Sequence, residues 1–403
     1  MNTTEIERCR KRIVQYIWDP EPKNDEEPGL PIWCMGTRYP PQQGLGLTDE
    51  FSRNNVRLQP SATKPSTPVW PESFLLDFES RIWMTYRSNF APIPNDASRD
   101  GTPSLTLSVR LRSQLIETQG FTSDTGWGCM IRSGQSLLAN AMAILSLGRG
   151  WRRSNGSKKE VQLLTLFADS PDAPFSIHNF VKYGAEFCGK RPGEWFGPTA
   201  TARCIQGLAE GYDQSNLQVY IADDNSDVYE EKFMSIARDE QDTVRPTLIL
   251  LGLRLGIDRV TEVYWDGLKA VLQLPQSVGI AGGRPSASHY FVAVHGSHFL
   301  YLDPHHTRPA LKHNEPSLYT EDEVDTYHTR RLRRLNIQDM DPSMLIGFLI
   351  KDENDWKDWQ DRVTSMEGKP IITIMRHSEP VSWQGRMEAV DEVEIFDDDD
   401  ELT

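Results

Sequence analysis

The segment FTSDTGWGCMIRSGQ contains the residue best suited to nucleophilic chemistry, Cys129. Cap-type residues at positions 123–125 and two nearby glycines predict that a helix begins at or near Cys129. The N-terminus of a helix carries partial positive charge and free N–H groups, which favour a thiolate and can bind a developing oxyanion. Taken alone, this pattern equally fits a small buried hydrophobic residue that starts a core helix.

The segment HFLYLDPHH supplies a candidate base with an acid beside it. In an extended chain, Asp303 and His305 project to the same side, and Pro304 biases Asp303 toward that conformation. A carboxylate in this position can fix the tautomer of the imidazole and stabilise the imidazolium, as a thiol peptidase requires. Without other evidence, the segment also fits a turn after a strand, with exposed histidines.

Metal and nucleotide sites find little support in the sequence. His305 and His306 are adjacent and would point to opposite faces of a strand, and no residue at helical ligand spacing completes a site. His289 and His298 lie in a predicted hairpin and are expected to be structural. The glycines of LGLRLG and AGGRPSASHY lack the context of a dinucleotide fold or a P-loop. We therefore expect neither a metal nor a cofactor.

Composition and charge favour a globular protein with a basic protein partner. Hydrophobic residues make up 38% and charged residues 25% of the chain, and the net charge is −15. This charge disfavours nucleic acid and anionic membrane surfaces as direct partners. The five cysteines are odd in number and include no CxxC pair, which argues against a disulfide framework and a zinc site. With no apparent signal peptide or membrane span, the expectation is a cytoplasmic monomer.

The order of the predicted elements favours an α+β fold, because helices come early and strands come late. Apolar periodicity predicts helices over residues 4–18, 73–90, 129–148, 198–212, 228–240, 263–274 and 352–366. Strands are predicted over residues 219–222, 246–256, the hairpin 289–294 and 298–303, a central strand 344–350, and a possible edge strand 371–375. Residues 19–71 are expected to be irregular, with an ordered anchor near Trp33 and Cys34.

Together these segments resemble the autophagins, the autophagy cysteine endopeptidases that act on a ubiquitin-like modifier. The resemblance covers roughly residues 73–366 and keeps the order found in that family. The matching segments are RIWMTYRSNF, FTSDTGWGCMIRSGQ, GEWFGPTA, LRLG, PQSVGIAGGRPSASHYFVAV, YLDPHHTRPA and DPSMLIGFLI.

The resemblance implies a papain-like fold with a small inserted subdomain. The peptidase domain would span residues 73–375, with the subdomain at roughly 155–245. A largely irregular extension, 1–72, would precede it, and an acidic flexible tail, 376–403, would follow. The substrate would be the modifier, cleaved after its C-terminal glycine as the precursor or removed from phosphatidylethanolamine, so membranes would be met only through the lipidated substrate. Recruitment to the preautophagosomal site would follow.

The resemblance also assigns roles to individual residues. Cys129 would be the nucleophile, His305 the base and Asp303 the orienting acid. Tyr86 would supply a hydroxyl to the oxyanion hole, although without the resemblance it reads as a core aromatic of a helix. Trp195, which otherwise reads as ordinary packing, would cover the substrate groove. The gating loop would consist of Arg284, Pro285, Ser286 and Ala287.

Two other functions remain open at this point. A Cys-His-Asp acyl transferase would use the same residue types, but in those enzymes His precedes Asp in the chain, which is not so here. A non-catalytic adaptor could bind the modifier through the same groove. The tail VDEVEIFDDDDELT lacks a clear aromatic-x-x-aliphatic motif of the kind that many relatives carry.

Overall fold

The computed structural model describes residues 21–24, 27, 29–41, 70–95, 120–153, 157–222, 227–284 and 287–377. The predicted helix over residues 4–18 and most of the acidic tail lie outside these ranges. So do Pro285 and Ser286 of the expected gating loop.

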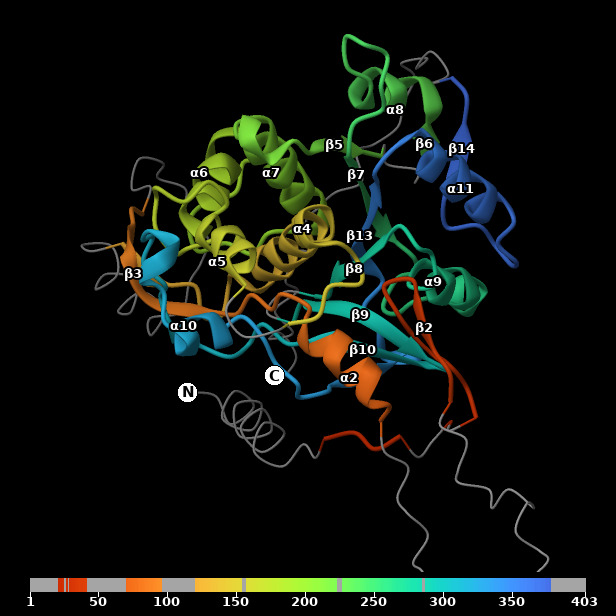
Figure 1. The fold of residues 1–403 in the computed structure, drawn as a ribbon, viewed down its shortest axis with the longest axis horizontal. Coiled ribbons are helices and arrows are strands. Elements are labelled where there is room, and N and C mark those ends of the chain that lie inside the picture. The colour runs from red at the N-terminus through yellow and green to blue at the C-terminus, as the bar shows by residue number, and fades with distance from the viewer. Residues whose placement is uncertain are drawn as a thin grey trace, which may run out of the picture.

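A mostly antiparallel sheet forms the centre of the molecule (Figure 1). Its main strands follow the order β12-β10-β9-β8-β13-β7-β5, and only β5 and β7 pair in parallel. In that order the strands are Arg334–Asn336, His298–Leu302, His289–His295, Ser277–Gly282, Ser343–Ile350, Thr247–Arg254 and Gln218–Ile221. The architecture is mixed α/β, and the antiparallel pairing excludes a doubly wound parallel sheet, as the sequence predicted.

Helices cover both faces of this sheet, which explains the nearly continuous apolar runs of β7 and β13 (Figure 1). Successive side chains of β7 alternate between two core clusters, with Leu248 and Leu250 in one and Ile249 and Leu251 in the other. The first cluster packs under α4 (Cys129–Leu147), α5 (Lys158–Thr165), α6 (Ile177–Phe187) and α7 (Pro198–Glu210). The second packs under α8 (Glu230–Ala237), α9 (Trp265–Val271) and α11 (Glu353–Thr364).

Smaller elements complete the described structure. A three-stranded sheet has the order β11-β3-β4 and places β3 beside the start of α4. Its strands are Arg308–Pro309, Arg87–Ile93 and Phe121–Ser123. A two-stranded parallel sheet joins β6 (Asp227–Tyr229) to β14 (Thr373–Met375). The remaining elements are α2 (Glu72–Glu79), α10 (Glu321–Asp325), η1 (Asp213–Ser215), η2 (Glu262–Tyr264), η3 (Pro316–Leu318) and η4 (Ile337–Asp339).

The prediction of one helix over residues 73–90 was wrong in its second half. Helix α2 ends at Glu79, and residues 80–86 form a turn and an irregular run that leads into β3. Side chains of α4 hold this irregular run: Asn140 accepts the N–H of Ile82 at 3.0 Å and donates to its carbonyl at 2.9 Å. Ser136 accepts the N–H of Met84 at 3.0 Å. These tertiary hydrogen bonds replace those of a helix.

The expected anchor near Trp33 and Cys34 is a strand of the central sheet. β1 (Ile32–Cys34) forms a hairpin with β2 (Thr37–Tyr39) and pairs antiparallel with β9. Residues 228–240 begin with β6 before α8, so that predicted helix was too long at its start.

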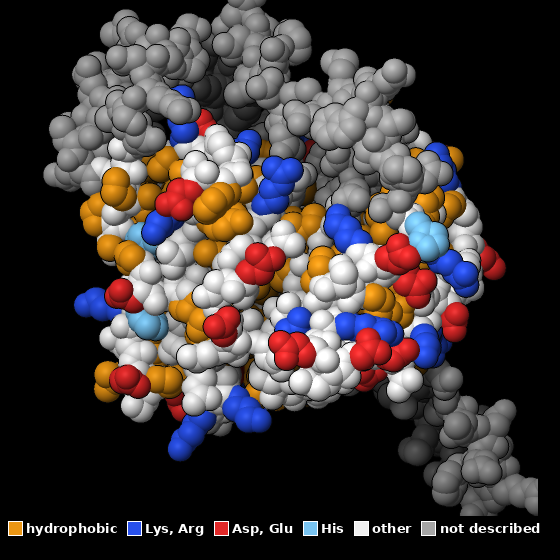
Figure 2. Space-filling model, turned by 90° about the horizontal axis from the view of Figure 1, so that it is seen from above, with side chains coloured by type: hydrophobic (Ala, Val, Ile, Leu, Met, Phe, Trp, Pro, Cys, Tyr) orange, Lys and Arg blue, Asp and Glu red, His pale blue; other side chains and the backbone are white. Residues whose placement is uncertain are grey.

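The described surface mixes charges of both signs. On the face seen in Figure 2, Lys and Arg side chains lie between Asp and Glu side chains, and hydrophobic side chains occur in small groups. This described part of the face shows no continuous basic stripe of the kind that follows a nucleic-acid backbone. Among the described residues, none of the helices is both long and apolar enough to cross a membrane.

Candidate active site

Cys129 is the first residue of α4, and the chain enters that helix through a tight turn. The N–H of Gly128 donates to the carbonyl of Asp124 at 2.9 Å. A Cβ on Gly128 would lie 2.7 Å from the Asp124 side chain, so the turn requires glycine there. The N-cap is Gly128, and no side chain caps the helix. The predicted helix start at Cys129 is confirmed, but the cap-type residues 123–125 do not cap it, because the Asp124 carboxylate is held by other partners.

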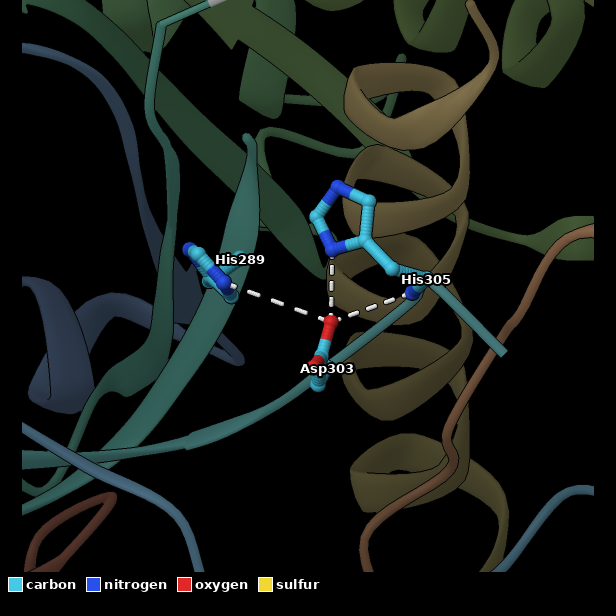
Figure 3. A group of neighbouring side chains, drawn as sticks. All are labelled: His289, Asp303 and His305. Carbon is cyan, nitrogen blue, oxygen red and sulfur yellow. Dashed lines mark hydrogen bonds and ion pairs between the residues drawn. The ribbon is translucent and has the colours of Figure 1, made fainter. Parts of the chain in front are cut away.

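Asp303 and His305 meet directly after β10 (Figure 3). Nδ1 of His305 lies 2.6 Å from Oδ1 of Asp303, and the backbone N–H of His305 donates to the same oxygen at 3.1 Å. The carboxylate thus holds the ring with Nδ1 toward it. Nε2 on the other side is buried and has no oxygen or nitrogen partner among the described residues. It is therefore the nitrogen left to face the Cys129 sulfur.

The electrostatics of the site favour a thiolate–imidazolium pair. Burial opposes ionisation of Cys129, but hydrogen bonding to His305, the charge of that ring and the backbone of Ser288 lower the pKa of the thiol. Burial also opposes the charged form of His305, yet its hydrogen bonds with Asp303 and Cys129 raise its pKa to about 9. The sulfur therefore ionises more readily than an ordinary thiol, while the ring keeps its proton up to about pH 9. A thiolate beside an imidazolium is the nucleophilic form of a cysteine.

His289 is a further ring in the site that the sequence did not assign. Its Nε2 lies 4.0 Å from Oδ1 of Asp303, and its ring centre lies 5.3 Å from that of His305 (Figure 3). Burial lowers the pKa of His289 to about 4, so the ring is neutral near pH 7. The three side chains offer possible metal-ligand atoms within 4.8 Å of one another. However, the 2.6 Å hydrogen bond between Asp303 and His305 already explains this arrangement.

Tyr86 lies against the candidate base, just before β3. Its ring stands nearly perpendicular to that of His305, with the centres 5.4 Å apart, and its N–H donates to Pro304 O at 2.9 Å. Burial and the charge of Cys129 raise the pKa of the phenol, which therefore stays protonated. A buried, protonated phenol beside the sulfur, together with the N–H groups of the first helical turn, can donate to an oxyanion.

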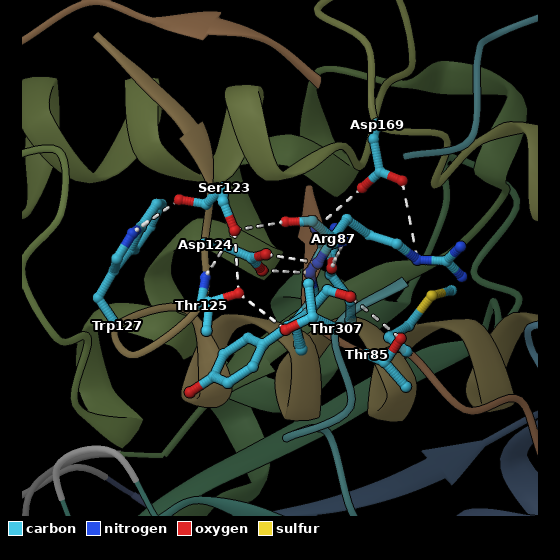
Figure 4. Close-up of polar contacts among 12 residues, drawn as sticks. Thr85, Arg87, Ser123, Asp124, Thr125, Trp127, Asp169 and Thr307 are labelled. Atoms are coloured by element: carbon cyan, nitrogen blue, oxygen red, sulfur yellow. Dashed lines mark hydrogen bonds and ion pairs between the residues drawn. The ribbon is translucent and has the colours of Figure 1, made fainter. Parts of the chain in front are cut away.

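A buried ionic network fixes the surroundings of the thiol (Figure 4). Asp124 accepts the N–H of Arg87 and the Nε of Arg132, both at 2.6 Å. Nη2 of Arg132 also lies 2.9 Å from Asp169, whose other oxygen accepts the N–H of Leu311 at 2.9 Å. The network therefore joins β3, the first turns of α4 and the chain that follows the candidate base.

Trp195 lies half-buried in the segment between α6 and α7, packed at the edge of the core. Nearby, the backbone of Gly193 packs against the Phe121 ring, and that ring lies 5.7 Å from the ring of Trp127. Trp127 belongs to the turn that leads into Cys129. The segment that carries Trp195 thus lies next to the start of α4.

The described ends of the expected gating loop differ in their surroundings. Arg284 is exposed, with its Nε 3.3 Å from Asp341, and its carbonyl accepts the N–H of Ala287 at 2.9 Å. The following residue, Ser288, is fully buried and donates its hydroxyl to Ser133 of α4 at 3.2 Å. Its backbone also contributes to the lowered pKa of the thiol. Sequence reasoning missed Ser288, whose one visible signal was its place directly after this loop.

Cys129, His305 and Asp303 have the types of side chain that a cysteine protease uses as nucleophile, base and orienting acid. The Peptidase C54 catalytic domain matches residues 71–362 of this chain. The chain is 77% identical over 398 residues to the cysteine protease atg4 of Emericella nidulans, with 99% of both chains covered. Identity to the probable cysteine protease atg4 of Aspergillus niger is 61%, covering 99% of this chain and 100% of that one. For the probable cysteine protease ATG4 of Coccidioides immitis it is 55%, with the same coverage. This chain belongs to the Peptidase C54 family of cysteine proteases.

Proposed function

We propose that this cysteine protease cleaves the ubiquitin-like autophagy modifier after its C-terminal glycine and releases it from phosphatidylethanolamine. The observation that carries the proposal is the 2.6 Å hydrogen bond between Asp303 and His305 beside a thiol at the start of α4. The names of the similar fungal proteins and the motif resemblance support the choice of substrate. The proposal includes a papain-like fold, with residues 155–245 as an inserted subdomain, and a cytoplasmic location.

In this mechanism the Cys129 thiolate attacks the carbonyl carbon of the glycine. The N–H of Cys129 and the hydroxyl of Tyr86 donate to the oxygen that becomes negative. As the intermediate collapses, Nε2 of His305 gives its proton to the leaving nitrogen, which is the amine of the next residue or of phosphatidylethanolamine. A thioester remains. His305 then takes a proton from water, the resulting hydroxide attacks the thioester, and the glycine carboxylate and the thiolate are released.

Selectivity for glycine would come from exclusion. A narrow groove covered by Trp195 admits an extended tail without side chains and rejects bulkier residues. The loop over residues 284–287 would move aside as the tail enters and would close behind it. Its position fits this role, because the buried Ser288 at its end contacts α4 next to the thiol.

The decisive experiment compares wild type with Cys129→Ser on the modifier carrying a C-terminal extension. We expect wild type to yield a product whose mass corresponds to a modifier chain ending at glycine, and the variant to yield none. Equal cleavage by both proteins would remove Cys129 from the nucleophilic role. Binding of the modifier without cleavage by wild type would favour the adaptor, and product formation only with an added amine acceptor would favour an acyl transferase.

A further inference from the structure

A second pair of cysteines lies where α6 packs against α7, apart from the nucleophile. Sγ of Cys188, at the C-terminal cap of α6, lies 3.9 Å from the carbonyl of Ala200 on α7. Sγ of Cys204 on α7 lies 3.6 Å from the carbonyl of Phe180 on α6. Each sulfur therefore contacts the backbone of the opposite helix. These two contacts also show that the helices run antiparallel here.

The close approach of these helices brings the two sulfurs together. A Cβ on Gly207 of α7 would lie 2.1 Å from the ring of Tyr183 on α6, so the helices approach closely only with glycine at this position. Ala200 precedes Cys204 by one helical turn, so the Sγ of Cys188 meets α7 at the turn that carries the Cys204 sulfur. Both cysteines are reduced, with Cys204 fully buried and Cys188 partly exposed.

The surroundings divide the pair into an attacking and a resolving thiol. Interaction with the neighbouring Cys204 thiol and the charges of Arg203 and Lys190 outweigh burial and lower the pKa of Cys188 to about 7. Interaction with Cys188 and burial raise the pKa of Cys204. A partly exposed, easily ionised sulfur beside a buried protonated one is the arrangement found in dithiols that exchange with disulfides.

We propose that Cys188 and Cys204 form an oxidisable dithiol that reacts with a low-molecular-weight disulfide and closes into a disulfide between α6 and α7. The Cys188 thiolate attacks one sulfur of the small disulfide, whose S–S bond breaks to release one thiolate. Cys204 then loses its proton and attacks the Cys188 sulfur, releasing the second thiolate. The protein gives up two electrons, and the small disulfide becomes two thiols.

The consequence for the site lies in the segment that this bond would enclose. Residues 189–203 lie between the two cysteines and include Trp195, so the disulfide ties both ends of that segment together. On the face of α7 toward α4, Thr201 packs against Gly134. We expect the disulfide to hinder movement of Trp195 and to slow entry of the substrate tail. This last step rests on the proposed function.

The first test detects the bond and needs no peptidase activity. Cys129→Ala protein is equilibrated in buffers of oxidised and reduced glutathione, its free thiols are blocked, and its peptides are mapped by mass spectrometry. We expect a peptide pair linked through Cys188 and Cys204 that a reductant separates. Cys34 is the internal control, because burial and the charge of Asp77 raise the pKa of this buried thiol, and it should stay reduced.

Single variants identify the attacking sulfur. Cys204→Ser should stop at a mixed disulfide of glutathione on Cys188, whereas Cys188→Ser should acquire neither modification. If a serine at the buried position 204 prevents folding, Cys188→Ser still tests the proposal, because Cys188 is partly exposed and its substitution should be tolerated. Reduced thiols throughout the oxidising buffers, or a link from Cys188 to a different cysteine, would overturn the proposal.

The second test concerns cleavage of the modifier. Wild type and the Cys188→Ser/Cys204→Ser double variant are oxidised together and assayed before and after reduction. We expect a severalfold reversible loss in wild type beyond that of the double variant, which reports oxidation of the remaining cysteines, including Cys129. Equal losses would overturn the link to Trp195. If the disulfide forms but no reduced protein cleaves the modifier, the proposed function fails while the dithiol stands.

Discussion

Arg132, one turn into α4, and Asp124, in the turn before that helix, form a buried ion pair, with Nε and Oδ2 2.6 Å apart and each side chain at most 1% exposed. Asp124 also accepts the N–H of Arg87 at 2.6 Å. Loss of the Asp124 carboxylate would leave the buried guanidinium of Arg132 with Asp169 as its one charged partner among the described residues. The pair thus couples the stability of the fold to the geometry around the thiol.

Asp124→Ala should lower the free energy of unfolding by about 3 kcal/mol, because breaking a buried pair leaves one charge without its partner. Chemical denaturation followed by tryptophan fluorescence measures this change. The exposed Asp266, paired only with Lys269 at the surface, provides a matched control. Asp266→Ala should change stability by less than about 0.5 kcal/mol. A similar small effect for Asp124 would contradict the importance of the network.

Asp303→Asn should reduce kcat/KM by at least about 100-fold, since the ring of His305 loses its orienting anion. The pKa of His305, raised to about 9 in the folded protein, should fall. Because His305 must be protonated in the ion pair, activity in wild type should decline as pH rises through about 9, and this limb should move to lower pH in the variant. Rates from pH 5 to 10 and NMR titration of the ring would measure both effects. An alkaline limb at the same pH in both proteins would exclude Asp303 as the partner of His305.

The thiol itself can be examined without substrate. The pKa of Cys129 is lowered mainly by His305, against the effect of burial. Alkylation by iodoacetamide should therefore remain fast below the pH at which an ordinary thiol, with a pKa of about 8.5, becomes protonated. In His305→Ala the midpoint of the rate profile should move upward. An unchanged midpoint in His305→Ala would show that His305 does not lower the pKa of Cys129.

Tyr86→Phe removes one donor from the proposed oxyanion hole and keeps the ring. We expect kcat to fall by roughly 100-fold with KM nearly unchanged, because the lost interaction forms only in the transition state. Tyr264→Phe, in the short helix η2 before α9, serves as the control and should retain full activity. A change in KM alone would instead assign Tyr86 to substrate binding.

Trp195→Ala should open the groove. The variant should bind the glycine-containing substrate less tightly, and its preference for glycine over alanine at the cleaved position should fall by about tenfold. Competition between two modifier substrates, one with each residue, measures this ratio directly. Phe187→Ala is a suitable comparison, since Phe187 is 64% exposed at the end of α6. An unaltered preference would remove Trp195 from the specificity determinants.

Several features of the site could be predicted because their causes are local. The start of α4 at Cys129 follows from a glycine-bounded turn before a long apolar helix. The meeting of Asp303 and His305 follows from the geometry of neighbouring residues in an extended chain. The hairpin of β9 and β10 and the central place of β13 follow from apolar runs of strand length.

Other features depend on contacts between segments that are distant in sequence. Residues 80–86 have helical periodicity, yet they form no helix, because Asn140 and Ser136 bind the backbone N–H groups of Ile82 and Met84. His289 and Ser288 reach the site only because β8, β9 and α4 pack together. Strand β8 was not predicted, because two of its six residues are glycines. Helices α5 and α6 were not predicted, because they follow loop-like stretches.

Strand β1 completes one side of β9. It pairs with Ala293, Val294 and His295, while β8 pairs with the preceding residues of the same strand, up to Phe291. Met35 continues the ladder by donating to the carbonyl of Val292 at 3.0 Å. Shortening the protein to begin at Trp70 would thus strip main-chain partners from a strand that starts at His289. The bare edge would offer a template for self-association, so compact-looking truncations are poor choices for crystallisation or assays.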